Sequence, residues 1–277
     1  MIQIGKYNTM RVVKEVDFGL YLDGGEEYDE ILLPTRYVPE NVQPDDEIEV
    51  FIYLDSEDRI IATTEDPIAE VGDFTFLQVV EVTPVGAFLD WGLPKDLLLP
   101  FREQKVKVNE GQVVLVYIYL DVESKRIVAS AKIEKFLDNI PPAYEIGQEV
   151  QVLVAEQSDL GYKCVIENTH SGMIYENEIF RKVFVGQSLK AYIKKIRDDE
   201  KIDISLQKIG YEAIDEIAQK VLNHIIKSGG SISITDKSSA DEISKVFGIS
   251  KKNFKKAIGN LYKQKLIKLA PGTIEMI

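Results

Sequence analysis

The residues of this sequence that could do chemistry are mainly aromatic and basic, and one group of them lies between positions 160 and 200. Aromatic rings stack on the bases of a single nucleic-acid strand, each stacked base contributing roughly 1–3 kcal/mol, and cations bind its phosphates. An alternating strand would put Lys190 and Lys194 on one face and Lys195 and Arg197 on the other. The group is therefore typical of a single-strand path. Its members are Tyr162, Lys163, Tyr175, Lys190, Lys194, Lys195 and Arg197, with Arg181 and Lys182 just before the basic run.

A second basic group lies near the C-terminus, where apolar residues recur at helical spacing. Phe254, Ile258, Leu261 and Tyr262 are expected to form the buried apolar stripe of a helix at about 251–265. Four lysines stand at i and i+4 on the same helix, so that their charges share its exposed faces. The helix either contacts phosphates or is a solvated lysine-rich helix. The four residues are Lys251, Lys252, Lys255 and Lys256.

A third, weaker group lies in the middle of the chain. An aromatic position is followed closely by the tryptophan, and basic residues stand in the next loop. The tryptophan could instead pack as a lid on a neighbouring domain, and the sequence leaves both interpretations open. We predict a secondary nucleic-acid contact from Phe88, Trp91, Arg102 and Lys105.

Residues suited to catalysis or metal binding are scarce. The one cysteine, Cys164, lies in a β-rich run, where a core thiol is expected. Of the two histidines, His170 falls in what reads as a hairpin turn and His224 on a helix surface. A single cysteine excludes a disulfide framework, and the sequence contains no phosphate loop, nucleophile elbow or zinc-protease motif. We therefore predict no enzymatic activity, no metal and no cofactor.

The formal net charge of −13 argues at first against a nucleic-acid partner, because affinity for such a partner comes largely from neutralising phosphates. The excess is local, however. Residues 1–70 hold 5 Lys or Arg against 18 Asp or Glu, a balance of −13. Residues 71–138 and 139–210 each stand at −2, whereas residues 211–277 hold 11 basic against 7 acidic side chains. The charge therefore excludes nucleic acid from the first segment and leaves a basic C-terminal segment.

Three segments of about 70 residues repeat the same glycine spacing. In each, one glycine is followed fourteen residues later by another. Short alternating β-branched runs between turn residues predict about five strands per segment. Such strands close into a small Greek-key barrel, whose sharp corners need residues without a Cβ atom. The glycine pairs are Gly5 and Gly19, Gly72 and Gly86, and Gly147 and Gly161.

These segments resemble the S1 domain, an OB-fold module of RNA-binding proteins. The nearest copies of its pattern are 17–22 (DFGLYL) and 85–89 (VGAFL). The third segment has Leu160 and Lys163 where the S1 pattern has aromatics, which favours phosphate contacts over base stacking. The first segment keeps both aromatics but carries Glu26, Glu27, Asp29 and Glu30 close to them, and we expect it not to bind nucleic acid.

The last segment changes to helical periodicity. Apolar residues predict a helix over 211–227, followed by a short strand at 231–234. Ser239 and Glu242 fit a capping box, and Ser250 is expected to cap the next helix. A turn at 271–272 then joins the two strands of a hairpin. This order is that of a winged helix.

Three S1-type repeats followed by a winged helix resemble the conserved virulence factor B family, whose members are RNA-binding regulators. The resemblance implies RNA as the ligand. The predicted fold is mainly β with a C-terminal α+β domain. We expect three tandem S1-like OB-fold barrels, at 1–68, 69–139 and 140–209, followed by a winged helix-turn-helix domain at 210–277.

The leading functional hypothesis is a non-catalytic, post-transcriptional regulator that binds single-stranded RNA through the third barrel and the winged helix. A DNA-binding transcriptional regulator acting through the winged helix is one alternative. An acidic scaffold for ribosome-associated proteins in translation is another. The chain has no apolar stretch of membrane-helix length and no apolar signal core, so we expect a cytoplasmic protein without a membrane partner. The sequence leaves the oligomeric state open.

Overall fold

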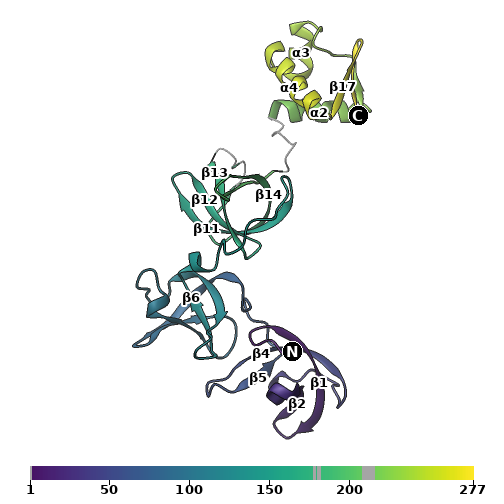
Figure 1. Cartoon of the computed structure of the whole chain (residues 1–277). Coiled ribbons are helices and arrows are strands. Elements are labelled where there is room, and N and C mark those ends of the chain that lie inside the picture. The colour runs from purple at the N-terminus through teal and green to yellow at the C-terminus, as the bar shows by residue number, and fades with distance from the viewer. Residues whose placement is uncertain (1, 177–178, 180–181, 208–215) are drawn as a thin grey trace. The chain divides into compact units, whose positions relative to one another are not determined.

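The computed structural model describes residues 2–176, 179, 182–207 and 216–277. These residues form three closed five-stranded barrels and a C-terminal domain of helices with a small sheet (Figure 1). The predicted fold class is therefore confirmed. In the part of the chain that the structure describes, no helix is long and apolar enough to cross a membrane.

The first barrel closes in the strand order β1-β2-β3-β5-β4. The short helix α1 (Gly25–Tyr28) joins β2 to β3, and the 3-10 turn η1 (Thr35–Tyr37) follows β3. Side chains that alternate along the strands, such as Val12, Leu22 and Leu33, are completely buried and fill its core. Its strands are β1 (Tyr7–Val16), β2 (Gly19–Gly24), β3 (Asp29–Pro34), β4 (Glu47–Leu54) and β5 (Ile60–Thr63).

The second barrel repeats this topology, with the order β10-β8-β7-β6-β9. The 3-10 turns η2 (Phe101–Glu103) and η3 (Ile133–Lys135) follow its third and fifth strands. Its strands are β6 (Phe74–Thr83), β7 (Gly86–Asp90), β8 (Leu97–Pro100), β9 (Val113–Leu120) and β10 (Ile127–Ser130).

The third barrel has the order β11-β12-β13-β15-β14. The sequence predicts His170 in a hairpin turn, and this is wrong: the turn is 167–169, and His170 is the first residue of β13. Its ring is buried, and Nε2 lies 2.8 Å from the carbonyl oxygen of Ile140, which satisfies the buried nitrogen. The strands are β11 (Glu149–Ser158), β12 (Gly161–Ile166), β13 (His170–Tyr175), β14 (Ser188–Ile196) and β15 (Ile202–Ser205).

The second glycine of each pair begins the second strand of its barrel, at a sharp corner. A Cβ atom at Gly161 (φ 137°) would lie 2.1 Å from the carbonyl oxygen of Ile174, which no side chain can accommodate. Just before each corner the first strand is bulged, for example between Val154 and Glu156 in the third barrel. Bulge and corner together bend the strand enough to close the sheet. The fourteen-residue glycine spacing therefore indicates where the strand bends to close each barrel.

The C-terminal domain has the predicted winged-helix order. Its three strands form a sheet in the order β16-β18-β17. The capping box is confirmed: the Ser239 hydroxyl accepts from the Glu242 amide, and the Glu242 carboxylate accepts from the Ser239 amide. Residues 211–215 of the predicted first helix lie outside the described residues. The elements are α2 (Glu216–Lys227), β16 (Ser231–Ile232), α3 (Ala240–Phe247), α4 (Lys251–Lys263), β17 (Ile267–Ala270) and β18 (Thr273–Met276).

Candidate nucleic-acid interface

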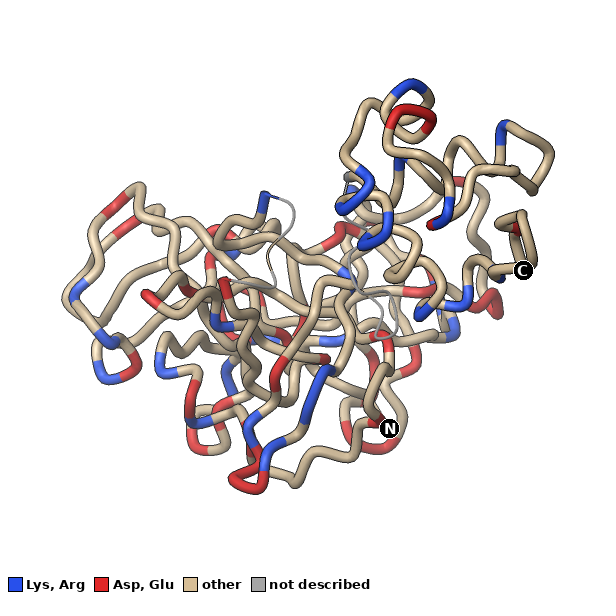
Figure 2. The backbone as a smooth tube through the Cα atoms, turned by 90° about the horizontal axis from the view of Figure 1, so that it is seen from above, with Lys and Arg blue, Asp and Glu red and all other residues tan. Residues whose placement is uncertain are grey.

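Helix α4 of the winged helix presents an exposed cationic face. Ser250 caps its first turn by accepting from the Asn253 amide, and Phe254, Ile258 and Leu261 are buried in the domain core. The prediction that Tyr262 is also buried is wrong, because its side chain is 54% exposed. The helix contains no acidic residue, and Figure 2 shows several basic positions close together on this domain. Three exposed lysines have no ion-pair partner among the described residues, namely Lys252, Lys255 and Lys256.

The fourth predicted lysine of this helix, Lys251, makes a contact within the domain. Lys251 is half-buried, and its ammonium group donates to the carbonyl oxygen of Ser238 at 2.7 Å, which ties α4 to the loop before α3. The wing adds little charge, because Lys268 forms a 2.9 Å ion pair with Glu275, its cross-strand neighbour on β18. The positive end of the α4 dipole lies at the same turn as Lys252, so both favour an anion there.

In the third barrel, carboxylates accompany the predicted cations. Lys163 is exposed on β12 and lies 2.9 Å from Glu156. Lys190 on β14 donates to Glu149 at 2.7 Å, and this hydrogen bond raises the pKa of Lys190. Exposed pairs of this kind contribute about 0–1 kcal/mol, so a phosphate can compete with either carboxylate.

The end of β14 differs from the alternation that the sequence predicts. Lys194 and Lys195 are both exposed, whereas Arg197 is half-buried. The guanidinium of Arg197 donates to both carboxylate oxygens of Asp203, at 2.9 Å from Nη2 and 3.2 Å from Nε. A strictly alternating strand would have put Lys195 on the same face as Arg197. Lys182 is exposed, and Arg181 lies outside the described residues.

The aromatic residues of the third barrel are only partly accessible. Tyr162 is half-buried, and its hydroxyl donates to the carbonyl oxygen of Val183 at 3.0 Å. Tyr175 is half-buried at the end of β13, opposite the corner glycine Gly161. Both rings therefore leave only part of their surface for a base, as the replacement of aromatics by Leu160 and Lys163 suggests.

In the second barrel, Phe88 and Trp91 lie in different environments. Phe88 is half-buried on the outer face of β7, beside its register partner Leu98. Trp91 is 2% exposed, its ring centre is 5.9 Å from that of Phe51, and its indole nitrogen donates to the Lys95 carbonyl oxygen. Of the two interpretations that the sequence left open for Trp91, the structure agrees with the lid, because the ring packs against Phe51 of the first barrel.

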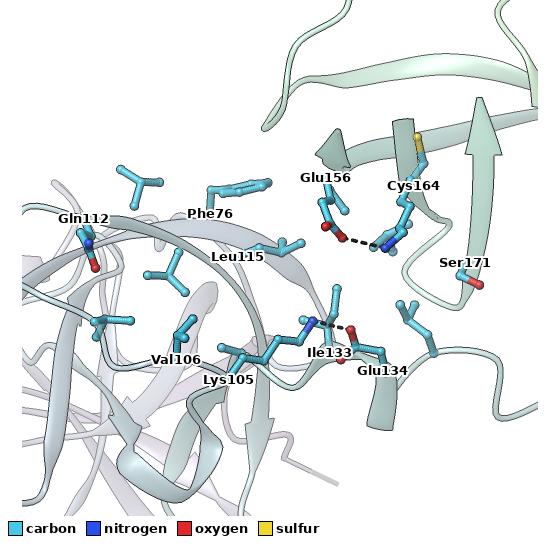
Figure 3. A pocket seen from close by; sticks show the side chains of 18 of the residues that line it. Phe76, Lys105, Val106, Gln112, Leu115, Ile133, Glu134, Glu156, Cys164 and Ser171 are labelled. Carbon is cyan, nitrogen blue, oxygen red and sulfur yellow. Dashed lines mark hydrogen bonds and ion pairs between the residues drawn. The ribbon is translucent and has the colours of Figure 1, made fainter. Parts of the chain in front are cut away.

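A pocket of about 740 Å³ has residues of both the second and the third barrel in its walls. It brings together two predicted cations, Lys105 and Lys163, each held by a carboxylate (Figure 3). Phe76, Leu115 and Ile133 supply apolar surface to the same pocket. Arg102, the remaining basic residue of the secondary group, is exposed at 3.8 Å from Asp121.

The first barrel has an exposed aromatic pair, although its negative charge predicts that it does not bind nucleic acid. Phe18 is 56% exposed, and its ring lies edge-on to Tyr21 with 6.1 Å between ring centres. The ammonium group of Lys14 lies 4.8 Å from the centre of the Tyr21 ring and 2.6 Å from Glu30. The ring pair of a base platform is thus present, but its cation is shared with an acid.

Two cations that sequence reasoning missed line a pocket beside Phe88. The pocket measures about 380 Å³, and Lys95 and Arg126 face it together with Asp58 of the first barrel. Sequence spacing gave no signal, because Arg126 and Asp58 are 68 positions apart and meet only through the packing of two barrels.

Cys164, the one cysteine of the chain, is buried in the third barrel. Burial raises the pKa of the Cys164 thiol to about 12, so it stays protonated and unreactive as a nucleophile. In the part of the chain that the structure describes, no group of three or more His, Cys, Asp or Glu side chains is placed to hold a metal ion.

Comparisons with known proteins agree with this architecture. Residues 4–65 and 71–132 each match the S1 domain family, and residues 219–276 match the CvfB-like winged helix domain. Conserved virulence factor B of Staphylococcus aureus is 28% identical over 84% of this chain and 82% of its own length. The protein YitL of Bacillus subtilis is 28% identical over 94% of this chain and 89% of its own.

Among solved structures, a multidomain protein with nucleic acid binding domains from Streptococcus pneumoniae aligns over 99% of this chain and 98% of its own. Its sequence identity is 24% and its TM-score 0.44. The S1 and winged-helix domains matched here are nucleic-acid-binding types rather than catalytic ones.

Proposed function

We propose that this chain is a member of the conserved virulence factor B family that binds single-stranded RNA and regulates gene expression after transcription. The third barrel and the winged helix are the main binding elements in this proposal. The observation that carries it is the cationic face of α4, where Lys252, Lys255 and Lys256 are exposed without carboxylate partners among the described residues.

The preference for a single strand follows from the barrels. Duplex nucleic acid hides the faces of its bases, whereas an unpaired strand offers them to exposed rings. Partly exposed rings occur on the second and third barrels, at Phe88 and Tyr175. A ligand that uses both these rings and the α4 lysines must be single-stranded over part of its length.

A DNA-binding role is the second candidate, and one observation favours it. The exposed lysines lie on the second helix of the helix-turn-helix, the helix that enters the major groove in DNA-bound proteins of this type. Such a role would use α4 alone and leave the barrel rings without a ligand.

Binding of the full chain to three matched probes tests these alternatives. The probes are a single-stranded RNA, the single-stranded DNA of the same sequence, and the corresponding DNA duplex, each measured by fluorescence anisotropy over a salt series. We expect the RNA to bind most tightly, because the 2′-hydroxyl adds contacts that DNA lacks. Tightest binding to the duplex would favour the second candidate, and binding to none of the three would refute the proposed function.

A further inference from the structure

The first two barrels are fixed to one another by a shared core. Phe51 and Tyr53 of β4 belong to the same buried cluster as Trp91, Leu93 and the interior of the second barrel. The Ile68 amide donates to the Trp91 carbonyl oxygen at 2.8 Å, which ties the connecting segment to the second barrel. The junction between these barrels is therefore a defined surface.

The 380 Å³ pocket at this junction, which we call the junction pocket, has an apolar wall on the second barrel. Ala87 and Leu89 of β7 are buried inside the barrel, so Phe88 between them lies on the outer face. Its partner on β8 is Leu98, and Leu98 is in turn aligned with Val128 of β10, so the wall crosses three neighbouring strands. A pocket of this size suits a small ligand rather than a folded partner.

The opposite side of the junction pocket is polar and comes partly from the first barrel. The β4–β5 hairpin places the Asp58 carboxylate 3.0 Å from the Lys95 ammonium group and in contact with the Arg126 guanidinium. These two hydrogen bonds lower the pKa of Asp58, which keeps it ionised. The Asp58 carboxylate of the first barrel thus forms ion pairs with two cations of the second barrel.

The hairpin holds Asp58 in place. The Asp55 carboxylate accepts from the amides of Glu57 and Arg59, and Asp58 itself has a positive φ of 61°. Lys95 also donates to the Asp55 carbonyl oxygen. A carboxylate bridging a lysine and an arginine has the charge and hydrogen-bond geometry of a bound phosphate oxygen pair.

We propose that the junction pocket binds one nucleotide of a nucleic-acid strand, with its base on Phe88 and its phosphate in the place of Asp58 between Lys95 and Arg126. The proposal rests on the proposed function, because it assumes that the chain binds a single strand. Asp58 then acts as an internal competitor that sets how strongly the second barrel binds. Asp96 also lines the pocket, and burial together with Asp90 and Glu81 raises its pKa.

The substitution Asp58→Asn in the full chain tests this competition. It removes the competing charge, while the shared apolar core still holds the barrels together. One additional phosphate contact on a single strand steepens the salt dependence by about 0.7 and raises affinity about eightfold at 50 mM salt and about threefold at 200 mM. The matched control is Glu57→Gln, which removes the same charge from the same hairpin. Glu57 pairs with Arg59 of its own hairpin, so this variant leaves Lys95 and Arg126 occupied.

Two further measurements locate the effect in the junction pocket. The probe is a labelled single-stranded RNA of about 12 nucleotides, within the length that OB-folds cover. Phe88→Leu is expected to weaken its binding about fivefold or more through lost stacking. Trp91 is the only tryptophan of the chain and lines the pocket, so RNA binding should change its fluorescence.

A gain in Asp58→Asn with little change in Glu57→Gln supports the proposal. Equal gains in both variants would show a general charge effect and overturn it, as would wild-type affinity in Asp58→Asn. Absence of RNA binding by the unmodified chain refutes the proposed function itself, and the two failures are therefore distinguishable.

Discussion

Replacement of Lys252, Lys255 and Lys256 by glutamine should remove three phosphate contacts from α4 without changing its fold. All three side chains are exposed and pair with no carboxylate among the described residues. Each phosphate contact on a single strand contributes a salt slope of about 0.7, so three contribute about 2. The same relation predicts that affinity falls about 500-fold at 50 mM salt and about 30-fold at 200 mM.

The assay is fluorescence anisotropy of a labelled single-stranded RNA at several salt concentrations, with the full chain. The control replaces three exposed lysines of the same domain that lie outside α4, namely Lys227, Lys237 and Lys245. It changes the net charge equally and should leave the salt slope nearly unchanged. A triple α4 variant with the slope of the unmodified chain would show that this helix contacts no phosphate.

Four further predictions follow from single side chains. Gly161→Ala should destabilise the third barrel, by on the order of 3 kcal/mol in urea unfolding, because its Cβ would lie 2.1 Å from a carbonyl oxygen. Gly259→Ala on α4 meets no atom within 4 Å and should raise stability by about 0.5–1 kcal/mol. Cys164 should resist alkylation in the native chain and react only on unfolding, because burial raises its pKa to about 12. Burial of Glu103 opposes its ionisation, but hydrogen bonds from a hydroxyl and an ammonium group outweigh this and lower its pKa. Its contribution to stability is therefore complete above about pH 4.3 and is lost as pH falls through the folded pKa, so Glu103→Gln should flatten the acid limb of a thermal melting profile.

The barrels were predictable because the feature that closes them is local in the sequence. A corner such as Gly161 excludes every side chain whatever the surroundings, so its spacing survives in the amino-acid pattern of all three repeats. The caps of the winged helix are equally local, since Ser239 and Glu242 are three positions apart. Constraints that act within one turn or one hairpin can therefore be predicted from the sequence.

The state of each candidate cation could not be predicted, because it depends on partners distant in the chain. Lys190 meets Glu149 across 41 positions, through the neighbouring strands β14 and β11. Lys251 resembles Lys252 in the sequence, yet it is tied to the Ser238 carbonyl oxygen and its neighbour is exposed. The sequence leaves Trp91 open between a nucleic-acid contact and a lid on a neighbouring domain, and only its contact with Phe51 of the first barrel distinguishes them. A count of charges or rings therefore overestimates the binding surface.

The acidic excess of residues 1–70 gains a more specific meaning from these contacts. Most cations of the first barrel are paired within it, as Arg11 is with Asp23, so the remaining carboxylates set its negative surface. Asp58 is different, because it neutralises Lys95 and Arg126 of the second barrel. In the proposal above, this carboxylate therefore competes with phosphate for the cations of the second barrel. Because salt screens both the internal pair and the incoming strand, the balance between them is decided by local geometry rather than by net charge.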